Sequence, residues 1–114
     1  DVTHLGVVLV CGAARIYFTG DAINTFATLD ALVESVRVLR PQVGFLTTHP
    51  TEGEFPYFDG CVLMARRIGL EAVYPSHYQC FVKRDYDPGL WAAQFAGPGP
   101  SPRIMGYNQT IIAP

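Results

Sequence analysis

The chain has 114 residues, a formal net charge of −2 and 49% apolar residues, values typical of one globular domain. Acidic and basic residues nearly balance and no basic run exceeds the pair Arg66–Arg67, which excludes the electrostatic pattern of a nucleic-acid-binding protein. No apolar stretch approaches the ~18 residues of a membrane span, so we expect no membrane partner.

The three cysteines, Cys11, Cys61 and Cys80, are odd in number and have no CxxC spacing. This pattern argues against a disulfide framework or a zinc knuckle and favours free thiols in a reducing, cytoplasmic compartment. The first residues show neither a signal-peptide pattern nor an initiating methionine, so we expect the chain to begin within a longer protein.

The first predicted elements form a hairpin. Residues 5–10 (LGVVLV) and 15–19 (RIYFT) are rich in β-branched and aromatic residues, and Gly12 lies in the turn between them. The second strand leads through Thr-Gly to Asp21.

An amphipathic helix is predicted for residues 28–39, followed by Pro41 and a strand at 43–48. Its inward face is expected to hold the apolar residues that recur every three or four positions. These are Leu29, Leu32, Val33, Val36 and Leu39.

The segment HPTEGEFP at 49–56 is predicted to be a loop because of its prolines and glycine. A second helix is expected to begin at Asp59 and end at Gly69. We expect it to bury Val62, Leu63, Ala65 and Ile68. A strand at 70–76 then leads to His77.

A short helix at 88–95 is predicted behind Asp87, an N-cap candidate followed by proline. A Pro/Gly loop follows at 97–102, and residues 103–112 are expected to form a closing strand or a hairpin broken around Gly106. This order predicts one α/β domain over residues 1–114: a mixed sheet with helices on one face and an uncovered apolar face, which is half of a layered sandwich.

The candidates for chemistry are Asp21 and the three histidines, His4, His49 and His77, each near a predicted strand end. Asp21 is interpreted as a metal ligand or general base, or alternatively as a helix cap. His77 is a candidate metal ligand or acid–base group, or a histidine whose partner is backbone. His4 is a candidate ligand beside Asp21 or a solvated terminal residue.

His49 and Glu52 share the loop at 49–56, and Tyr78 follows His77. His49 is a candidate ligand, a substrate contact or simply an exposed residue. Glu52 belongs to a solvated loop face or reaches the site, and Tyr78 belongs to the core or to the substrate side.

Three motifs in this order resemble one family. They are Gly6-Val7-Val8 with RIYFTGD at 15–21, Pro75-Ser76-His77, and Asp87-Pro88. The chain resembles the C-terminal half of a metallo-β-lactamase-fold hydrolase, nearest the branch of L-ascorbate-6-phosphate lactonase. The likeness extends over nearly the whole chain and implies the C-terminal αβ half of an αββα sandwich.

The resemblance implies a metal-dependent hydrolase that acts on a small-molecule lactone, ester or phosphorylated sugar through a metal-bound hydroxide. Asp21 would bridge two divalent ions, Mn or Zn, and His77 would ligate the second ion. His4 lies closer to Gly6 than the family's middle histidine ligand does, so it would be that ligand in a shifted position or a residue beside it. The family's first cluster, His-x-His-x-Asp-His, is absent from these 114 residues, so the isolated chain is expected to be inactive.

A second hypothesis comes from a different class of protein. The chain would be a non-catalytic scaffold whose uncovered sheet face binds a partner, either the missing N-terminal half or another copy of itself. The missing cluster and the low charged fraction of 16% favour this alternative.

Overall fold

The computed structural model describes residues 5–21, 24–48, 58–79 and 87–112. Its elements follow in the order β1 (Val7–Cys11), β2 (Ala14–Phe18), the 3-10 helix η1 (Asn24–Thr28), α1 (Asp30–Arg37), β3 (Val43–Thr47), α2 (Phe58–Ile68), β4 (Ala72–Ser76), α3 (Pro88–Ala92) and β5 (Ser101–Pro102). None of the helices within these ranges has the length and hydropathy of a membrane-spanning segment.

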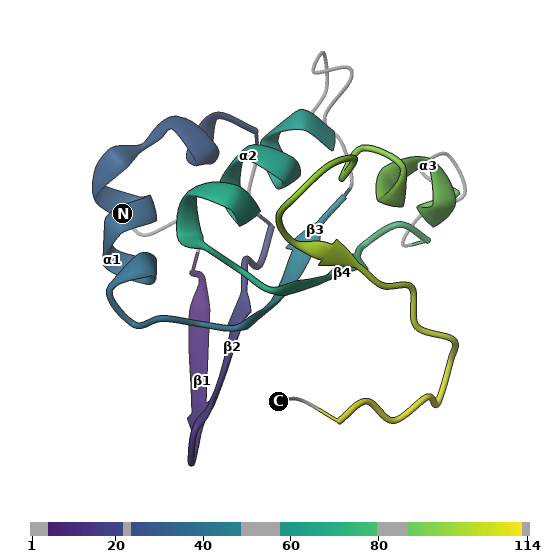
Figure 1. The fold of residues 1–114 in the computed structure, drawn as a ribbon, viewed down its shortest axis with the longest axis horizontal. Coiled ribbons are helices and arrows are strands. Elements are labelled where there is room, and N and C mark those ends of the chain that lie inside the picture. Colours follow the sequence, from purple (N-terminus) through teal and green to yellow (C-terminus); the bar gives the residue numbers. More distant parts are fainter. Residues whose placement is uncertain (1–4, 22–23, 49–57, 80–86, 113–114) are drawn as a thin grey trace.

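The five strands form one mixed sheet in the order β1-β2-β3-β4-β5. β1 and β2 are antiparallel, whereas β2, β3, β4 and β5 are parallel neighbours. Figure 1 shows α1 and α2 together on one side of the sheet. The α/β class predicted from the sequence is therefore confirmed.

The predicted hairpin is also confirmed. β1 and β2 are joined by a short turn in which Gly12 adopts a φ of 59°, a left-handed conformation that glycine adopts without steric cost. Leu9 pairs with Ile16, so the side chains of these two residues lie on the same face of the sheet.

The main core lies between the sheet and the helices. Tyr17, Leu46 and Val73 contribute one buried side chain from each of three neighbouring strands. Against them pack buried side chains from the helical layer: Ala27, Val33, Val36, Cys61, Met64, Ala65, Ile68 and Trp91. Removing this apolar surface from water stabilises the layered arrangement.

The outer face of the sheet carries a row of stacked aromatic rings. Phe18 stacks on Phe45 with ring centroids 4.9 Å apart, and Phe45 stacks on Tyr74 at 5.0 Å. The segment after β5 contributes Met105 and Ile111 to the cluster that contains Tyr74. Toward β1 the face opens, and Val7 and Leu9 are 55% and 51% exposed.

The first helix differs from its prediction. The expected span of residues 28–39 begins as the 3-10 helix η1, and the α-helix itself is α1. Val33 and Val36 are buried as expected, but Leu29 and Leu39 are exposed because both lie outside the α-helical turns.

In α2 the predicted inward face is wrong at one position. Ala65 and Ile68 are buried, but Leu63 is 42% exposed and Met64 is buried instead. The apolar residues at 61–65 are nearly continuous, so the helical period alone did not fix which of them face the sheet.

The prediction of a closing strand or hairpin over residues 103–112 is wrong. β5 contains only Ser101 and Pro102, which fall within the predicted loop at 97–102. The backbone N–H groups of Ser101 and Arg103 donate to Glu71 and Val73 over 2.8 Å each. Pro102 has no N–H to donate, and both hydrogen bonds to β4 come from its neighbours, so a proline here is compatible with an edge strand.

Candidate active site

Asp21 follows β2 through a turn that requires glycine. Gly20 has a φ of 63°, and a Cβ at this position would lie 2.6 Å from the Leu5 carbonyl oxygen. Both the backbone conformation and the close approach of residue 5 exclude larger side chains. The turn brings the carboxylate of Asp21 to the carboxyl end of the parallel sheet.

Two buried threonines hold this turn against β3. The Thr47 backbone N–H donates to Thr19 Oγ1 over 3.0 Å, and the Thr47 hydroxyl donates to the Gly20 carbonyl. The Thr19 backbone N–H donates to the Phe45 carbonyl over 3.1 Å. Because both threonines are almost fully buried, these bonds form away from water and fix the position of the turn.

His77 follows β4 directly and adopts a φ of 62°. The end of β4 is tied to the end of β3, because the Thr48 N–H and hydroxyl both donate to the Ser76 carbonyl, over 3.0 and 2.8 Å. A non-glycine residue with a left-handed backbone is uncommon and often occurs at functional sites. This conformation turns the chain at the end of the strand.

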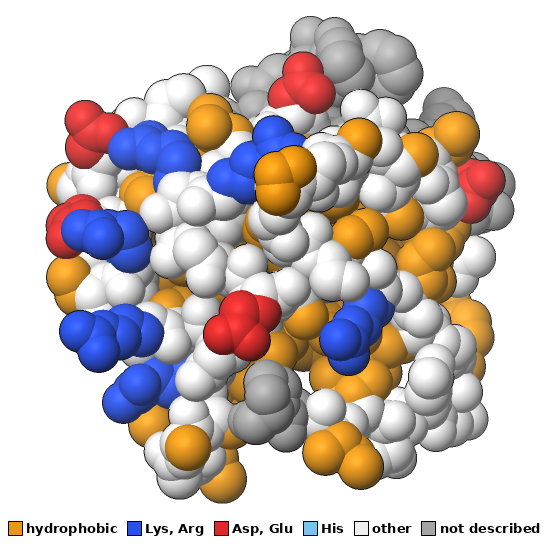
Figure 2. Space-filling view, in the orientation of Figure 1, with side chains coloured by type: hydrophobic (Ala, Val, Ile, Leu, Met, Phe, Trp, Pro, Cys, Tyr) orange, Lys and Arg blue, Asp and Glu red, His pale blue; other side chains and the backbone are white. Residues whose placement is uncertain are grey.

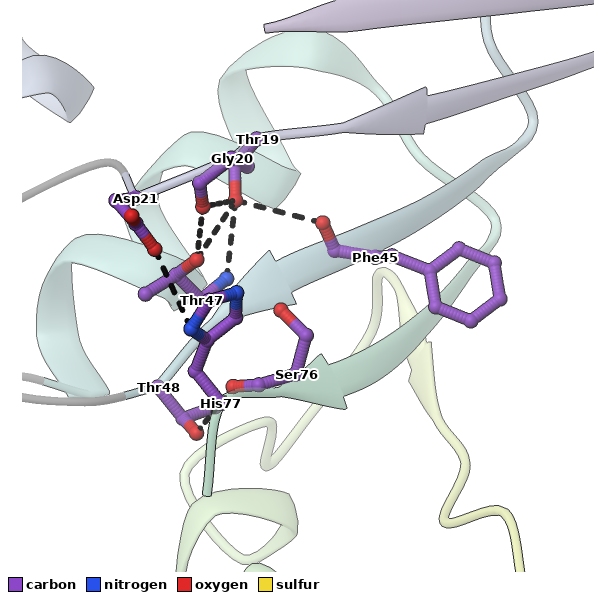
Figure 3. A network of polar contacts seen from close by, with 8 residues as sticks. All are labelled: Thr19, Gly20, Asp21, Phe45, Thr47, Thr48, Ser76 and His77. Atoms are coloured by element: carbon purple, nitrogen blue, oxygen red, sulfur yellow. Dashed lines mark hydrogen bonds and ion pairs between the residues drawn. The ribbon is translucent and has the colours of Figure 1, made fainter. Parts of the chain in front are cut away.

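The two turns bring Asp21 and His77 together. Asp21 Oδ1 lies 3.3 Å from His77 Nδ1, and the side chains are 56% and 41% exposed. Figure 3 shows the two side chains pointing toward each other from turns on either side of Thr47 and Thr48. A carboxylate oxygen and an imidazole nitrogen at this spacing form an ion pair or face one common ligand, and solvent reaches both.

The donor set agrees in part with a metal centre. Carboxylate oxygen and imidazole nitrogen are ordinary ligands of divalent ions such as zinc and manganese. Across the described ranges, however, no group of three or more His, Cys, Asp or Glu residues is placed to hold a metal ion. Asp21 and His77 therefore fit as two ligands of a site that needs further donors.

Tyr78 is half-buried beside His77. Both residues line a shallow hollow of about 340 Å³ together with Gln79 and Tyr107. The Tyr107 hydroxyl donates to Gln79 Oε1 over 2.8 Å, which holds the segment after β5 at this position. The role of Tyr78 on the substrate side stays a prediction.

Tyr107 was not identified from the sequence as a residue near the site. It lies 30 positions after His77, in a segment whose path depends on tertiary packing. A tyrosine between glycine and asparagine indicates a turn but gives no sign of where that turn lies. His4, His49 and Glu52 lie outside the described residues, so their predicted roles have no structural counterpart here.

The sequence matches no known family model and no curated protein. The fold, however, resembles that of a solved structure, Igni18, described as a novel metallo hydrolase from the hyperthermophilic archaeon Ignicoccus hospitalis. The TM-score is 0.69 and the sequence identity 22%, over 93% of this chain and 44% of Igni18. This chain thus shares its fold with part of a metallo hydrolase.

Proposed function

We propose that this chain is the second αβ half of an αββα metal-dependent hydrolase and that Asp21 and His77 are two of its metal ligands. One observation carries the proposal: Asp21 Oδ1 and His77 Nδ1 lie 3.3 Å apart, at strand ends of a fold shared with a metallo hydrolase. In α/β sheets the carboxyl ends of the strands are the usual position of ligand sites.

Asp21 is proposed to bridge two divalent ions, and His77 to ligate one of them. The Gly20 turn and the bonds between Thr19 and Thr47 would hold the carboxylate in place. A bound divalent ion would supply Lewis acidity to polarise the oxygen of a scissile ester, lactone or phosphoester. An oxygen and a nitrogen ligand suit both manganese and zinc, and we propose one of these two as the metal.

The proposed substrate is a small-molecule lactone, ester or phosphorylated sugar. The hollow beside His77 supports this assignment because two tyrosines, Tyr78 and Tyr107, are among its lining residues. Sugars present apolar C–H faces as well as hydroxyls, and tyrosine contacts both kinds of surface. His49 and Glu52 are proposed to line the same side from their loop.

The missing ligands are proposed to come from His4 and from a first half that carries His-x-His-x-Asp-His. That half would pack on the outer face of the sheet, where Val7 and Leu9 are exposed beside Phe18. An apolar face of this kind is usually covered in a layered fold. Reading the encoding frame upstream of Asp1 tests this directly, since a frame without the cluster would contradict it.

Metal titration by isothermal calorimetry tests the site itself. The wild-type protein, Asp21→Asn, His77→Gln and a control, Glu71→Gln, are titrated with MnCl₂ and with ZnCl₂. Glu71 is an exposed carboxylate just before β4, at the opposite end of that strand from His77, so its loss should leave metal binding unchanged. Each site variant is expected to weaken binding at least about tenfold, as loss of a ligand does in metal sites. Equal affinities in all four proteins would contradict the proposal.

The second candidate function is a non-catalytic scaffold that binds a partner through its outer sheet face. The open end of that face, with Val7 and Leu9 more than half exposed, favours it. Under this alternative, calorimetry detects no metal binding that depends on Asp21 or His77. A concentration-dependent mass in light scattering would then identify a second copy of the chain as the partner.

A further inference from the structure

A basic hollow lies at the amino ends of β2, β3 and β4, the opposite end of these strands from Asp21 and His77. It has a volume of about 740 Å³, and its wall includes Arg15, Arg37, Arg40 and Arg67. Figure 2 shows several basic side chains along the side of the molecule on which α1 lies in Figure 1. Pro41 and Gly69 complete the wall near the carboxyl ends of α1 and α2.

The charge of this hollow differs from that of the whole chain. Four arginines line it, and Glu71 is the acidic residue among its lining residues. Glu34 and Asp30, which are not part of the lining, pair with two of these arginines, so one positive charge remains in excess. The whole chain carries −2. Half of the eight Lys and Arg residues therefore surround one concave surface.

Two of the arginines are held by acidic partners or backbone. Arg37 makes a double hydrogen bond with Glu34 at 2.8 and 2.9 Å, and Arg67 donates to Asp30 and to the Ala27 carbonyl. Both lie in the last turns of helices, where a cation also complements the helix dipole. Their positions are thus explained by the fold.

The side chains of Arg15 and Arg40 have no such structural role. In the part of the chain that the structure describes, neither guanidinium has a hydrogen-bond or ion-pair partner, and neither residue lies within a helix. Their backbones are nevertheless fixed. Gln42 accepts a bond from the Arg15 N–H over 2.8 Å, and Arg40 has a left-handed φ of 50° with its N–H donating to the Arg37 carbonyl over 2.9 Å.

We propose that this basic hollow binds a small anion with at least two phosphate groups, with Arg15 and Arg40 as its principal ligands. Guanidinium groups form paired hydrogen bonds with phosphate oxygens, and those already bound to carboxylates are less available for this contact. The volume of the hollow lies within the range of about 300–1,000 Å³ typical of small-molecule sites. The site is separate from the metal ligands, because Arg15, Gln42 and Glu71 lie at or just before the amino ends of β2, β3 and β4.

Calorimetric titration with inorganic pyrophosphate, in buffer free of divalent metal and low in salt, tests the proposal. Wild-type protein is expected to bind one equivalent, and Arg15→Ala/Arg40→Ala to bind at least about tenfold more weakly. Glu71→Gln should bind at least twofold more tightly, since it removes the negative charge from the wall. Orthophosphate should bind about tenfold more weakly than pyrophosphate, because it offers one phosphate group in place of two.

Arg66→Gln is the charge-matched control. Arg66 is exposed on α2, does not line the hollow and donates to the Ala96 carbonyl. The Arg66→Gln variant should bind pyrophosphate with the same affinity as the wild type. Arg15→Lys/Arg40→Lys keeps the charge and loses the planar guanidinium group, so it should bind pyrophosphate with intermediate affinity. This variant takes the place of the alanine variant if the latter fails to fold. Absence of binding by the wild type, or equal affinity in the wild type and both double variants, overturns the proposal.

Discussion

At the residue scale, Gly20 positions Asp21 through two separate constraints. Its φ of 63° favours glycine, and the Leu5 carbonyl oxygen occupies the space that a Cβ would need. Gly12 has a similar φ of 59°, yet a Cβ at that position would meet no atom within 4 Å. The two glycines thus share a backbone conformation and differ in steric contact.

Replacing Gly20 by alanine is therefore expected to lower the free energy of unfolding by about 2–4 kcal/mol, the sum of backbone strain and the clash with residue 5. Gly12→Ala should cost about 1–2 kcal/mol, because only the backbone conformation is unfavourable there. Urea denaturation followed by circular dichroism measures both changes. An equal decrease in the free energy of unfolding in the two variants would show that the contact with Leu5 does not contribute.

Cys61 is a second residue whose chemistry depends on its surroundings. Its thiol donates to the Thr47 carbonyl over 2.9 Å, and burial raises its pKa from 9.0 to about 12. Because the thiolate is the reactive form, Cys61 should resist iodoacetamide at pH 8 in the folded protein, whereas the exposed Cys11 should react. Peptide mass spectrometry distinguishes the two sites. In urea both should be alkylated, and rapid labelling of Cys61 without urea would contradict the prediction.

The same pKa shift predicts a pH dependence of stability. The unfolded chain loses the Cys61 proton near pH 9 and the folded chain only near pH 12, so unfolding becomes more favourable as pH rises through this window. Below pH 9 the contribution to stability is fully retained. Between pH 8 and pH 10, the urea midpoint should fall further in the wild type than in Cys61→Ala. An equal decrease in both proteins would exclude Cys61 as the cause.

At the scale of elements, α3 is short and depends on its first turn. Its N-cap Asp87 accepts a hydrogen bond from the Gly89 N–H at 2.8 Å, and Pro88 needs no acceptor at the first helical position. The helix contributes the almost fully buried Trp91 to the main core. Loss of the cap should therefore be reported by the tryptophan.

We expect Asp87→Ala to lower the free energy of unfolding by about 1 kcal/mol, the usual cost of losing such a cap. Guanidinium denaturation followed by Trp91 fluorescence measures the change. Asp87→Asn keeps an oxygen acceptor and serves as the control, with a smaller loss. If asparagine and alanine destabilise the protein equally, the capping bond does not account for the effect.

At the scale of the whole molecule, the two faces of the sheet differ in how fully other segments cover them. One is covered by the helices, and the other is only partly covered by the segment after β5. Val7, Leu9 and Phe18 remain exposed at the open end of this second face. Apolar residues grouped in this way indicate an interaction surface.

The isolated chain is accordingly expected to associate with itself at high concentration through this face. Leu9→Lys should weaken association at least about tenfold, because a charge would be buried against apolar side chains. Val10→Lys is the matched control, since the adjacent residue points to the opposite side of β1. Sedimentation equilibrium measures both. A monomeric wild type, or equal effects of the two lysines, would contradict the prediction.

The sequence by itself determined the α/β class, the hairpin and the approximate positions of β3, β4, α2 and α3. Local patterns decide these features: alternating β-branched residues, helical periodicity, and Gly12, Asp87 and Pro88 at their ends. It also singled out Asp21 and His77 as candidates, because each follows a strand end. Such signals lie within a few neighbouring residues and need no knowledge of packing.

Only the tertiary structure decided which of these residues meet. Asp21 and His77 are separated by 56 positions, and their 3.3 Å contact depends on β2, β3 and β4 lying side by side in parallel. The same holds for Tyr107 near His77 and for Arg15 near Arg40. The exposed Leu63 and the two-residue β5 were decided by packing against the sheet, since their local patterns were compatible with other arrangements.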